Sequence, residues 1–362
     1  MLRSWVLVQK TKVQKPKSGF LREFYPDNPL FDSPGTLDYS PCQDQLAAMT
    51  TPQNKFIGIN VSVDHVRGAL VDENGFILES KIAGISKELV PQLAALVRDL
   101  STPEVGAVGV AIPGLVNRQT DRVVAPRDLP STVVEDLHGE LTRATGLRVE
   151  LENDANAAAY GEFKVGAGRG SRNLFYMMIG NGIGGAIILD GKLWTGASGF
   201  AGEVGHITID TEGLDCVCGN RGCLETVASA PSIVRRARER LNRDSTSSLS
   251  RLGLQKSFTA EDVAHQANEG DDFALMMIER TGKYIGTGVA SVINLLNIEK
   301  IVLGGGVMDA GSLILNPIIA EVKRRAFQPC FDATEIVAAK LGLDGAPIGA
   351  AMLARDAGTG SH

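Results

Sequence analysis

Short apolar runs alternate along the chain with segments that have helical spacing. The runs at residues 55–63, 105–117, 147–154 and 300–308 are rich in β-branched side chains and predict buried strands. An Asn74–Gly75 pair between two further apolar runs predicts a hairpin turn. This pattern indicates sheets whose strands are separated by turns and helices.

Apolar residues at positions i, i+3 and i+4 predict helices over residues 88–100, 132–146 and 273–297. An Ala-rich helix is expected over 155–168, a further strand over 335–341 and a last helix over 347–357. The order of elements gives two successive β-β-β-α-β-α sets, which predict a pair of α/β lobes. Ligands of such sheets bind beyond the carboxyl ends of the strands.

The lobes are expected at residues 55–165 and 166–362, with the C-terminal helix packing back on the first lobe. Residues 1–54 differ from the rest of the chain. The first 22 carry six basic residues and no acid, and a Pro/Asp/Ser-rich stretch follows. We expect a poorly ordered tail without a helix-turn-helix, and a start at Met49 would make most of it dispensable. A transit peptide is a weaker alternative.

The composition limits the classes of function. The 362 residues carry a net charge of −6, which disfavours binding to nucleic acid. No membrane partner is expected, because no apolar run approaches the roughly 20 residues of a membrane span. No signal peptide is visible, so we expect a cytoplasmic protein.

Cys216, Cys218 and Cys223 fall within eight residues, and His206 precedes them by ten. Three thiolates and one imidazole are a typical set for a closed, structural zinc site, whereas disulfides would need an oxidising compartment. The predicted zinc loop, residues 206–223, is flanked by Glu203 and Glu225, which the metal does not need. These carboxylates could accept hydrogen bonds from sugar hydroxyls, or could be solvated acids on a zinc knuckle.

Asp154 stands where a predicted strand passes into a helix, and it is the candidate general base for a substrate hydroxyl. The alternative is that Asn153 or Asp154 simply caps the helix. The glycine-rich turn at 180–185 lies between two strands, where it could cradle phosphate or form a hairpin without a ligand. The Gly304–Gly306 turn could admit a nucleobase or permit tight packing.

Five of these motifs resemble those of the ROK family, which contains bacterial sugar kinases and sugar-responsive repressors. The motifs are GFAGEVGH with CVCGNRGCLE, END at 152–154, GNGIGGAI at 180–187 and VLGGGV at 302–307. The resemblance implies the two-lobed sugar kinase, hexokinase and actin-like fold. It implies the following roles: Asp154 as general base; Asn153, Glu203, His206, Glu225 and Gly114 at the sugar; Gly182, Gly184, Gly185, Gly305 and Gly306 at the nucleotide; and His206, Cys216, Cys218 and Cys223 at structural Zn²⁺.

One motif departs from the family pattern. Family kinases carry Asp-x-Gly-Gly-Thr in the first strand-turn, where the Asp serves Mg²⁺, whereas this chain has Asn60-Val61-Ser62-Val63-Asp64. A neutral amide and a bulky Val63 suit a site for Mg²⁺ and phosphate poorly. Repressor members also show a degraded turn at this place.

The leading prediction is a glucokinase-like enzyme that transfers phosphate from ATP to the 6-hydroxyl of a hexose. The alternatives are a non-catalytic sensor that binds a hexose and has lost ATP use, and a zinc-stabilised binding fold without a sugar role. The sugar is expected to be a hexose or an N-acetylhexosamine. The resemblance also implies a homodimer or homotetramer.

Overall fold

The structure, a computed structural model, describes residues 54–117, 120, 122–124, 136–241, 246–255 and 257–358. They belong to one compact unit within Pro52–His362. The predicted N-terminal tail lies outside the described residues except for Asn54.

Twelve strands are described: β1 (Lys55–Val61), β2 (His65–Asp72), β3 (Ile77–Gly84), β4 (Val105–Ile112), β5 (Leu115–Asn117), β6 (Arg122–Val124), β7 (Arg148–Asn153), β8 (Leu174–Ile179), β9 (Ile183–Leu189), β10 (Lys192–Leu193), β11 (Lys300–Gly304) and β12 (Glu335–Ala338). The α-helices are α2 (Leu89–Leu100), α3 (Leu137–Thr145), α4 (Asp154–Val165), α5 (Glu225–Ala228), α6 (Ala230–Leu241), α7 (Ser248–Gln255), α8 (Ala260–Asn268), α9 (Asp272–Leu296), α10 (Ser312–Arg325), α11 (Gln328–Asp332) and α12 (Gly345–Ala357). Short 3₁₀ turns are η3 (Val204–His206), η4 (Gly306–Ala310) and η5 (Gly342–Asp344).

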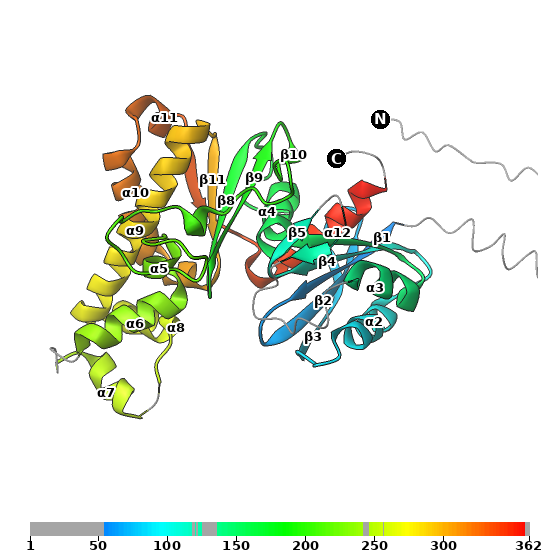
Figure 1. Ribbon diagram of the computed structural model, residues 1–362, viewed down its shortest axis with the longest axis horizontal. Coiled ribbons are helices and arrows are strands. Elements are labelled where there is room, and N and C mark those ends of the chain that lie inside the picture. Colours follow the sequence, from blue (N-terminus) through cyan, green and yellow to red (C-terminus); the bar gives the residue numbers. More distant parts are fainter. Residues whose placement is uncertain are drawn as a thin grey trace, which may run out of the picture. The chain divides into compact units, whose positions relative to one another are not determined.

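Two five-stranded sheets share one topology (Figure 1). The first runs β3-β2-β1-β4-β7 and the second runs β10-β9-β8-β11-β12. In each sheet the first three strands pair antiparallel, and the remaining pairs are parallel. The prediction of an α/β fold with a repeated strand order is confirmed.

Helices α4 and α12 lie at the centre of this arrangement. One apolar cluster joins side chains of α4 and α12 to residues from both sheets. A second cluster lies between the first sheet, α2 and α3, and a third lies between the second sheet and helices α6 and α8–α10. Helix α4 begins directly after β7 and also contacts β8 and β9, so its first residues lie beside strands of both sheets.

The structure differs from the predicted elements in three places. The run 105–117 forms β4 and β5, separated by a turn in which Gly114 has a φ of +119°. The described part of the helix predicted at 132–146 begins at Leu137, where the Asp136 carboxylate accepts a hydrogen bond from the Gly139 amide. Strand β12 ends at Ala338, and the Lys340 and Leu341 amides that follow both donate to the Glu162 carboxylate.

Among the described residues, none of the helices is long and apolar enough to cross a membrane.

Candidate functional site

The Asn153 side chain caps helix α4. Its amide oxygen accepts hydrogen bonds from the backbone N–H groups of Ala155 (2.9 Å) and Asn156 (3.1 Å). Its amide nitrogen donates to the Gly114 carbonyl (2.9 Å) and to Asp154 Oδ1 (3.1 Å). A side-chain amide has two acceptor and two donor positions, so these four bonds use the whole capacity of Asn153. Asn153 therefore fixes the turn before β5 and the Asp154 carboxylate in place.

Asp154 is half-buried at the first position of α4. Burial raises the pKa of its carboxyl from 3.8 to about 6, and the negative charge of Glu203 adds to the rise. Hydrogen bonds from its own amide, the Ala155 amide and the Asn153 side chain act in the opposite direction. At pH 7 the group is mostly ionised and still a competent proton acceptor, as general-base catalysis requires.

Glu203 and His206 come from a loop that lies directly on β9. A Cβ atom at Gly202 would come within 2.3 Å of the Gly185 carbonyl oxygen, and one at Gly205 within 2.1 Å of the Ile183 carbonyl oxygen. Only glycine permits this approach of backbone to backbone. The contact positions Glu203 so that its charge acts on Asp154, and Glu203 Oε2 lies 3.8 Å from His206 Nε2.

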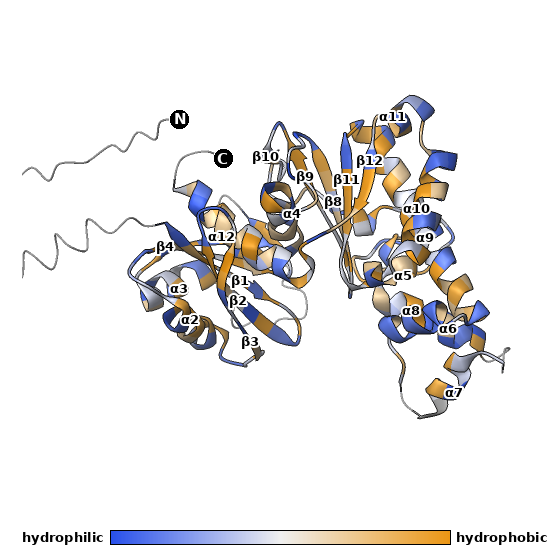
Figure 2. Cartoon of the chain, turned by 180° about the vertical axis from the view of Figure 1, so that it is seen from behind, coloured by the Kyte–Doolittle hydropathy of each residue, from blue (hydrophilic) through white to orange (hydrophobic). Residues whose placement is uncertain are grey.

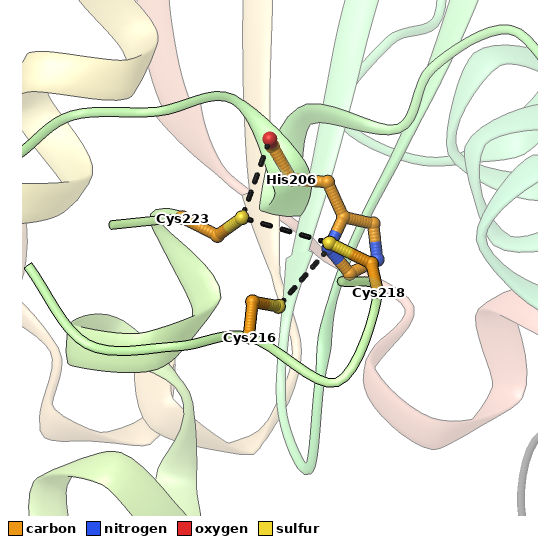
Figure 3. A group of neighbouring side chains, drawn as sticks. All are labelled: His206, Cys216, Cys218 and Cys223. Atoms are coloured by element: carbon orange, nitrogen blue, oxygen red, sulfur yellow. Dashed lines mark hydrogen bonds between the residues drawn. The ribbon is translucent and has the colours of Figure 1, made fainter. Parts of the chain in front are cut away.

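The other ring nitrogen of His206 faces the cysteines (Figure 3). Its Nδ1 lies 3.6 Å from Cys216 Sγ, and Cys218 Sγ lies 3.8 Å from Cys223 Sγ. All four candidate ligand atoms lie within 4.8 Å of one another. Around a tetrahedral zinc ion with Zn–S bonds of about 2.3 Å, neighbouring sulfur atoms are about 3.8 Å apart. The four residues therefore fit a zinc ion.

The described cysteines are all thiols, without a disulfide among them. Burial, together with the neighbouring thiols of Cys216 and Cys218, raises the pKa of Cys223 to about 12. The Asn220 amide lowers the pKa of the exposed Cys218. A cation that enters this cluster must displace protons from the thiols, which makes its binding dependent on pH.

Glu225 is buried at the start of α5, two residues after Cys223. Its Oε2 accepts a hydrogen bond from the Ile183 amide (2.8 Å). Glu225 thus ties the residues after the cysteine cluster to the beginning of β9.

A cavity of about 540 Å³ opens beside the glycine-rich turn between β8 and β9. Asn181 of that turn, Arg235 and Arg238 of α6, and the segment Phe258–Glu261 line it. A Cβ atom at Gly306 would lie 3.6 Å from Glu261 Oε1, so the start of η4 lies near the same segment. Sequence reasoning missed the lining residues from α6 and 258–261, because no motif links them to the turn.

The predicted nucleotide glycines have different surroundings. Gly182 lies in the turn, where its carbonyl accepts a hydrogen bond from the Gly180 amide. A Cβ atom at Gly184 would lie 2.9 Å from Ala155 Cβ, and one at Gly185 would lie 2.5 Å from the Gly202 carbonyl oxygen. Gly305 has a φ of +89° and lies against the Ile179 backbone. Packing alone therefore accounts for three of the five predicted glycines, Gly184, Gly185 and Gly305.

The first strand-turn offers no carboxylate at its buried position. Asn60 Nδ2 donates to Ser62 Oγ (3.2 Å), while Asn60 Oδ1 is buried without a hydrogen-bond partner among the described residues. Asp64 is 84% exposed and bonds to the His65 ring, which lowers its pKa. Mg²⁺ sites that also hold phosphates usually use one or two carboxylates. The residues of this turn therefore do not fit a magnesium ion well.

Comparison with known proteins finds kinases and repressors alike. A model of the ROK family matches residues 56–357. The glucokinase of Thermotoga maritima is 33% identical over 84% of this chain and 98% of that protein. The xylose repressor of Bacillus subtilis is 29% identical over 83% of this chain and 77% of that protein.

Solved structures give the same division. A ROK family glucokinase from Streptomyces griseus, in complex with glucose and AMPPNP, is 32% identical over 83% of this chain and 99% of that chain, with a TM-score of 0.73. A ROK family transcriptional regulator homologous to Escherichia coli MLC is 29% identical over 83% and 77%, with a TM-score of 0.75. These neighbours confirm the predicted sugar kinase, hexokinase and actin-like fold.

Proposed function

Because the chain belongs to the ROK family, as its motifs predicted, we propose that it is a hexose kinase that transfers the γ-phosphoryl group of ATP to a sugar 6-hydroxyl. The observation that carries this proposal is Asp154, a carboxylate at the first turn of α4 whose pKa is raised to about 6. Such a group accepts a proton from a hydroxyl near neutral pH.

Asp154 removes the proton of the attacking hydroxyl as the phosphoryl group arrives, and Asn153 holds the Asp154 carboxylate by a hydrogen bond. Glu203 is 46% exposed and accepts hydrogen bonds from other hydroxyls of the hexose or N-acetylhexosamine. The Nε2 side of His206 faces the same region and takes part in holding the sugar. Glu225 and Gly114 are proposed as further sugar contacts.

His206 Nδ1 and the thiolates of Cys216, Cys218 and Cys223 hold Zn²⁺ in this proposal. The ion would supply a structural cross-link between these four residues, which would keep the loop folded. The loop in turn keeps Glu203 beside Asp154.

The nucleotide is proposed to enter the cavity beside the turn at 180–182, with Gly306 near its lining residue Glu261. Arg235 and Arg238 line this cavity and supply positive charge for phosphates. Since the turn at Asn60 does not fit Mg²⁺, we assign no step to that ion.

The turn at Asn60 favours a second candidate, a sensor that binds hexose without phosphorylating it. Asn60 carries an amide where the family kinases have a carboxylate, and the exposed Val63 stands where a glycine would let the backbone approach the phosphates closely. Phosphoryl transfer uses both of these features. The similarity to a xylose repressor and to a transcriptional regulator supports this candidate.

One experiment separates the two candidates. Purified protein is given Mg-ATP and a panel of hexoses and N-acetylhexosamines, and sugar 6-phosphate is measured alongside sugar binding by calorimetry. Formation of the 6-phosphate, with a loss of about 10²-fold or more in Asp154→Asn, supports the kinase. Asp190→Asn, an exposed change on the β9–β10 turn, is the matched control and should retain activity. Sugar binding without turnover would reject the kinase in favour of the sensor, and the absence of both would reject the two together.

A further inference from the structure

Helices α9 and α10 pack side by side on the second sheet, and a cavity of about 740 Å³ lies between them (Figures 1 and 2). This cavity shares no lining residue with the one beside the glycine-rich turn. Its charged lining consists of four cations and two acids: Arg280, Lys283, Arg324, Arg325, Glu279 and Glu321. Four positive and two negative formal charges give a net charge of +2, in a chain whose net charge is −6. The cavity therefore attracts anions that the chain as a whole repels.

Glu321 holds the two arginines of α10 in place. Its buried carboxylate accepts hydrogen bonds from Arg324 Nε (3.0 Å) and Nη2 (2.6 Å), and from Arg325 Nε. The hydrogen bonds from Arg324 and Arg325 lower the pKa of Glu321 to about 2, so this acid is ionised at neutral pH. A guanidinium carries five N–H donors, so most donors of both arginines remain for other partners. One carboxylate thus orders two cations and balances only one of them.

The cations of α9 form no ion pair. Arg280 Nε donates a hydrogen bond to the Tyr284 hydroxyl (3.2 Å), and neither Arg280 nor Lys283 pairs with a carboxylate in the part of the chain that the structure describes. Both side chains are exposed, and they are three positions apart on the helix, where like charges repel each other. An anion between them would relieve this repulsion.

A third unbalanced cation lies behind Tyr284. The Arg236 guanidinium of α6 is 5.2 Å from the centre of the Tyr284 ring and donates to Thr281 Oγ1. Arg236 is only 8% exposed, and its Nε and Nη1 have no hydrogen-bond partner among the described residues. Burial lowers the pKa of Arg236 to about 10, and the positive charge of Arg280 acts in the same direction. A buried charge without a counter-charge is costly, so an anion near Tyr284 would stabilise this region.

The charge and the size of the cavity indicate the kind of anion. Guanidinium groups bind phosphate oxygens through pairs of hydrogen bonds. A phosphate monoester carries a charge of about −1.5 to −2 at pH 7, which matches the net charge of the lining. The volume lies within the range of roughly 300–1,000 Å³ that is usual for small-molecule sites, so it has room for more than a phosphate group. The Tyr284 ring and Pro317 offer apolar contacts to an organic part.

We propose that the cavity between α9 and α10 is a binding site for a small phosphate monoester, such as a sugar or polyol phosphate. Arg280, Lys283 and Arg324 hold the phosphate group, and the organic part lies against Tyr284. The ligand joins α9 to α10 and supplies the counter-charge that the cations of α9 lack. Because it binds only the folded protein, it should also raise the melting temperature. This inference does not rest on the proposed function.

Isothermal titration calorimetry of the full chain tests the proposal. The probes are glycerol 3-phosphate, ribose 5-phosphate and glucose 6-phosphate, with inorganic phosphate as the fourth. At least one ester should bind about tenfold more tightly than inorganic phosphate, because only the ester reaches Tyr284. Esters that bind no better than inorganic phosphate would show that free phosphate is the ligand, and no binding of any probe would show that the cavity is not an anion site. Either result would overturn the proposal.

Charge reversals locate the bound ester. Lys283→Glu and Arg280→Glu should each weaken its binding by about tenfold or more, and should remove the rise in melting temperature. Lys323→Glu changes the net charge equally at an exposed position of α10 outside the cavity, so it should change the affinity by less than about threefold. All three positions are exposed, and circular dichroism checks that the variants fold. Ester binding that the two α9 variants leave unchanged, or that Lys323→Glu weakens as much, would place the ligand elsewhere and refute the assignment.

Discussion

Replacing Asp154 with asparagine should make the protein more stable while removing its capacity to accept a proton. The folded state raises the pKa of this carboxyl, which means that it disfavours the ionised form relative to the unfolded chain. Asparagine has nearly the same shape and carries no charge. Its Oδ1 can still accept the hydrogen bond that the Ala155 amide donates to Asp154 (2.9 Å).

The size of the gain follows from the pKa. One pKa unit corresponds to about 1.4 kcal/mol, so a rise from 3.8 to about 6 corresponds to about 3 kcal/mol at pH values above 6. The penalty is fully present above the folded pKa. It is relieved as the pH falls from about 6 toward 3.8, because the folded protein binds the proton before the unfolded chain does. The difference between variant and wild type should therefore be large at pH 8 and close to zero near pH 4.

Chemical denaturation at several pH values measures this difference. Glu88→Gln, an exposed change before α2, should show no comparable dependence on pH and serves as the control. An Asp154→Asn protein that is less stable than the wild type at pH 8, or whose advantage does not shrink on acidification, would refute the reasoning. In that case burial would not be what raises the pKa.

Three other outcomes are expected. If the protein is a kinase, its rate should fall on acidification with a midpoint near pH 6, the pKa of Asp154. Glu203→Gln should move this midpoint to lower pH, because the Glu203 charge helps raise the pKa of Asp154. A midpoint that does not move in the pH–rate profile would contradict this. Chelation or Cys218→Ser should lower both thermal stability and sugar affinity, with about one zinc per chain lost in metal analysis; loss of neither would remove the zinc proposal. Glu162→Gln should lower the free energy of unfolding, measured with denaturant, by about 2–3 kcal/mol, because the buried Glu162 carboxylate accepts hydrogen bonds from the Ala167, Lys340 and Leu341 amides. A loss below about 0.5 kcal/mol would show that the glutamine side chain replaces the carboxylate in these hydrogen bonds.

The predictions that held depend on information that is local in the sequence. The periods of the apolar positions determined the strands and helices, because each element buries one face against its own neighbours. The cysteine cluster could be predicted because three of its members lie within eight residues, and a loop that short brings their side chains together. The predicted division into lobes and the assigned ligand roles remain predictions.

Features formed by distant segments were not predictable. The cavity beside the glycine-rich turn takes its walls from α6 and from residues 258–261, whose approach to Asn181 depends on helix packing. Glu162 has no sequence signal for its role, since its three partners lie up to 179 positions away. The alternative that Asn153 simply caps α4 was open in the sequence, and the structure shows that it does cap this helix.

The motif glycines are weak evidence for catalysis, because close packing of the backbone explains them without a ligand. Gly185 and Gly202 let the Glu203 loop lie on β9, and a sensor needs this arrangement as much as a kinase does. Residues that the fold does not need carry more information. The raised pKa of Asp154 predicts that its charge lowers stability at neutral pH, whereas a sensor could accept the same hydroxyl with an uncharged amide at no such cost. Asn60 argues in the opposite direction, because it places an amide where a site for a cation uses a carboxylate, and the buried oxygen of this amide has no hydrogen-bond partner among the described residues. If both arguments are right, the protein transfers phosphate slowly, and Asn60→Asp, which places a carboxylate at this turn, should raise the rate of sugar 6-phosphate formation.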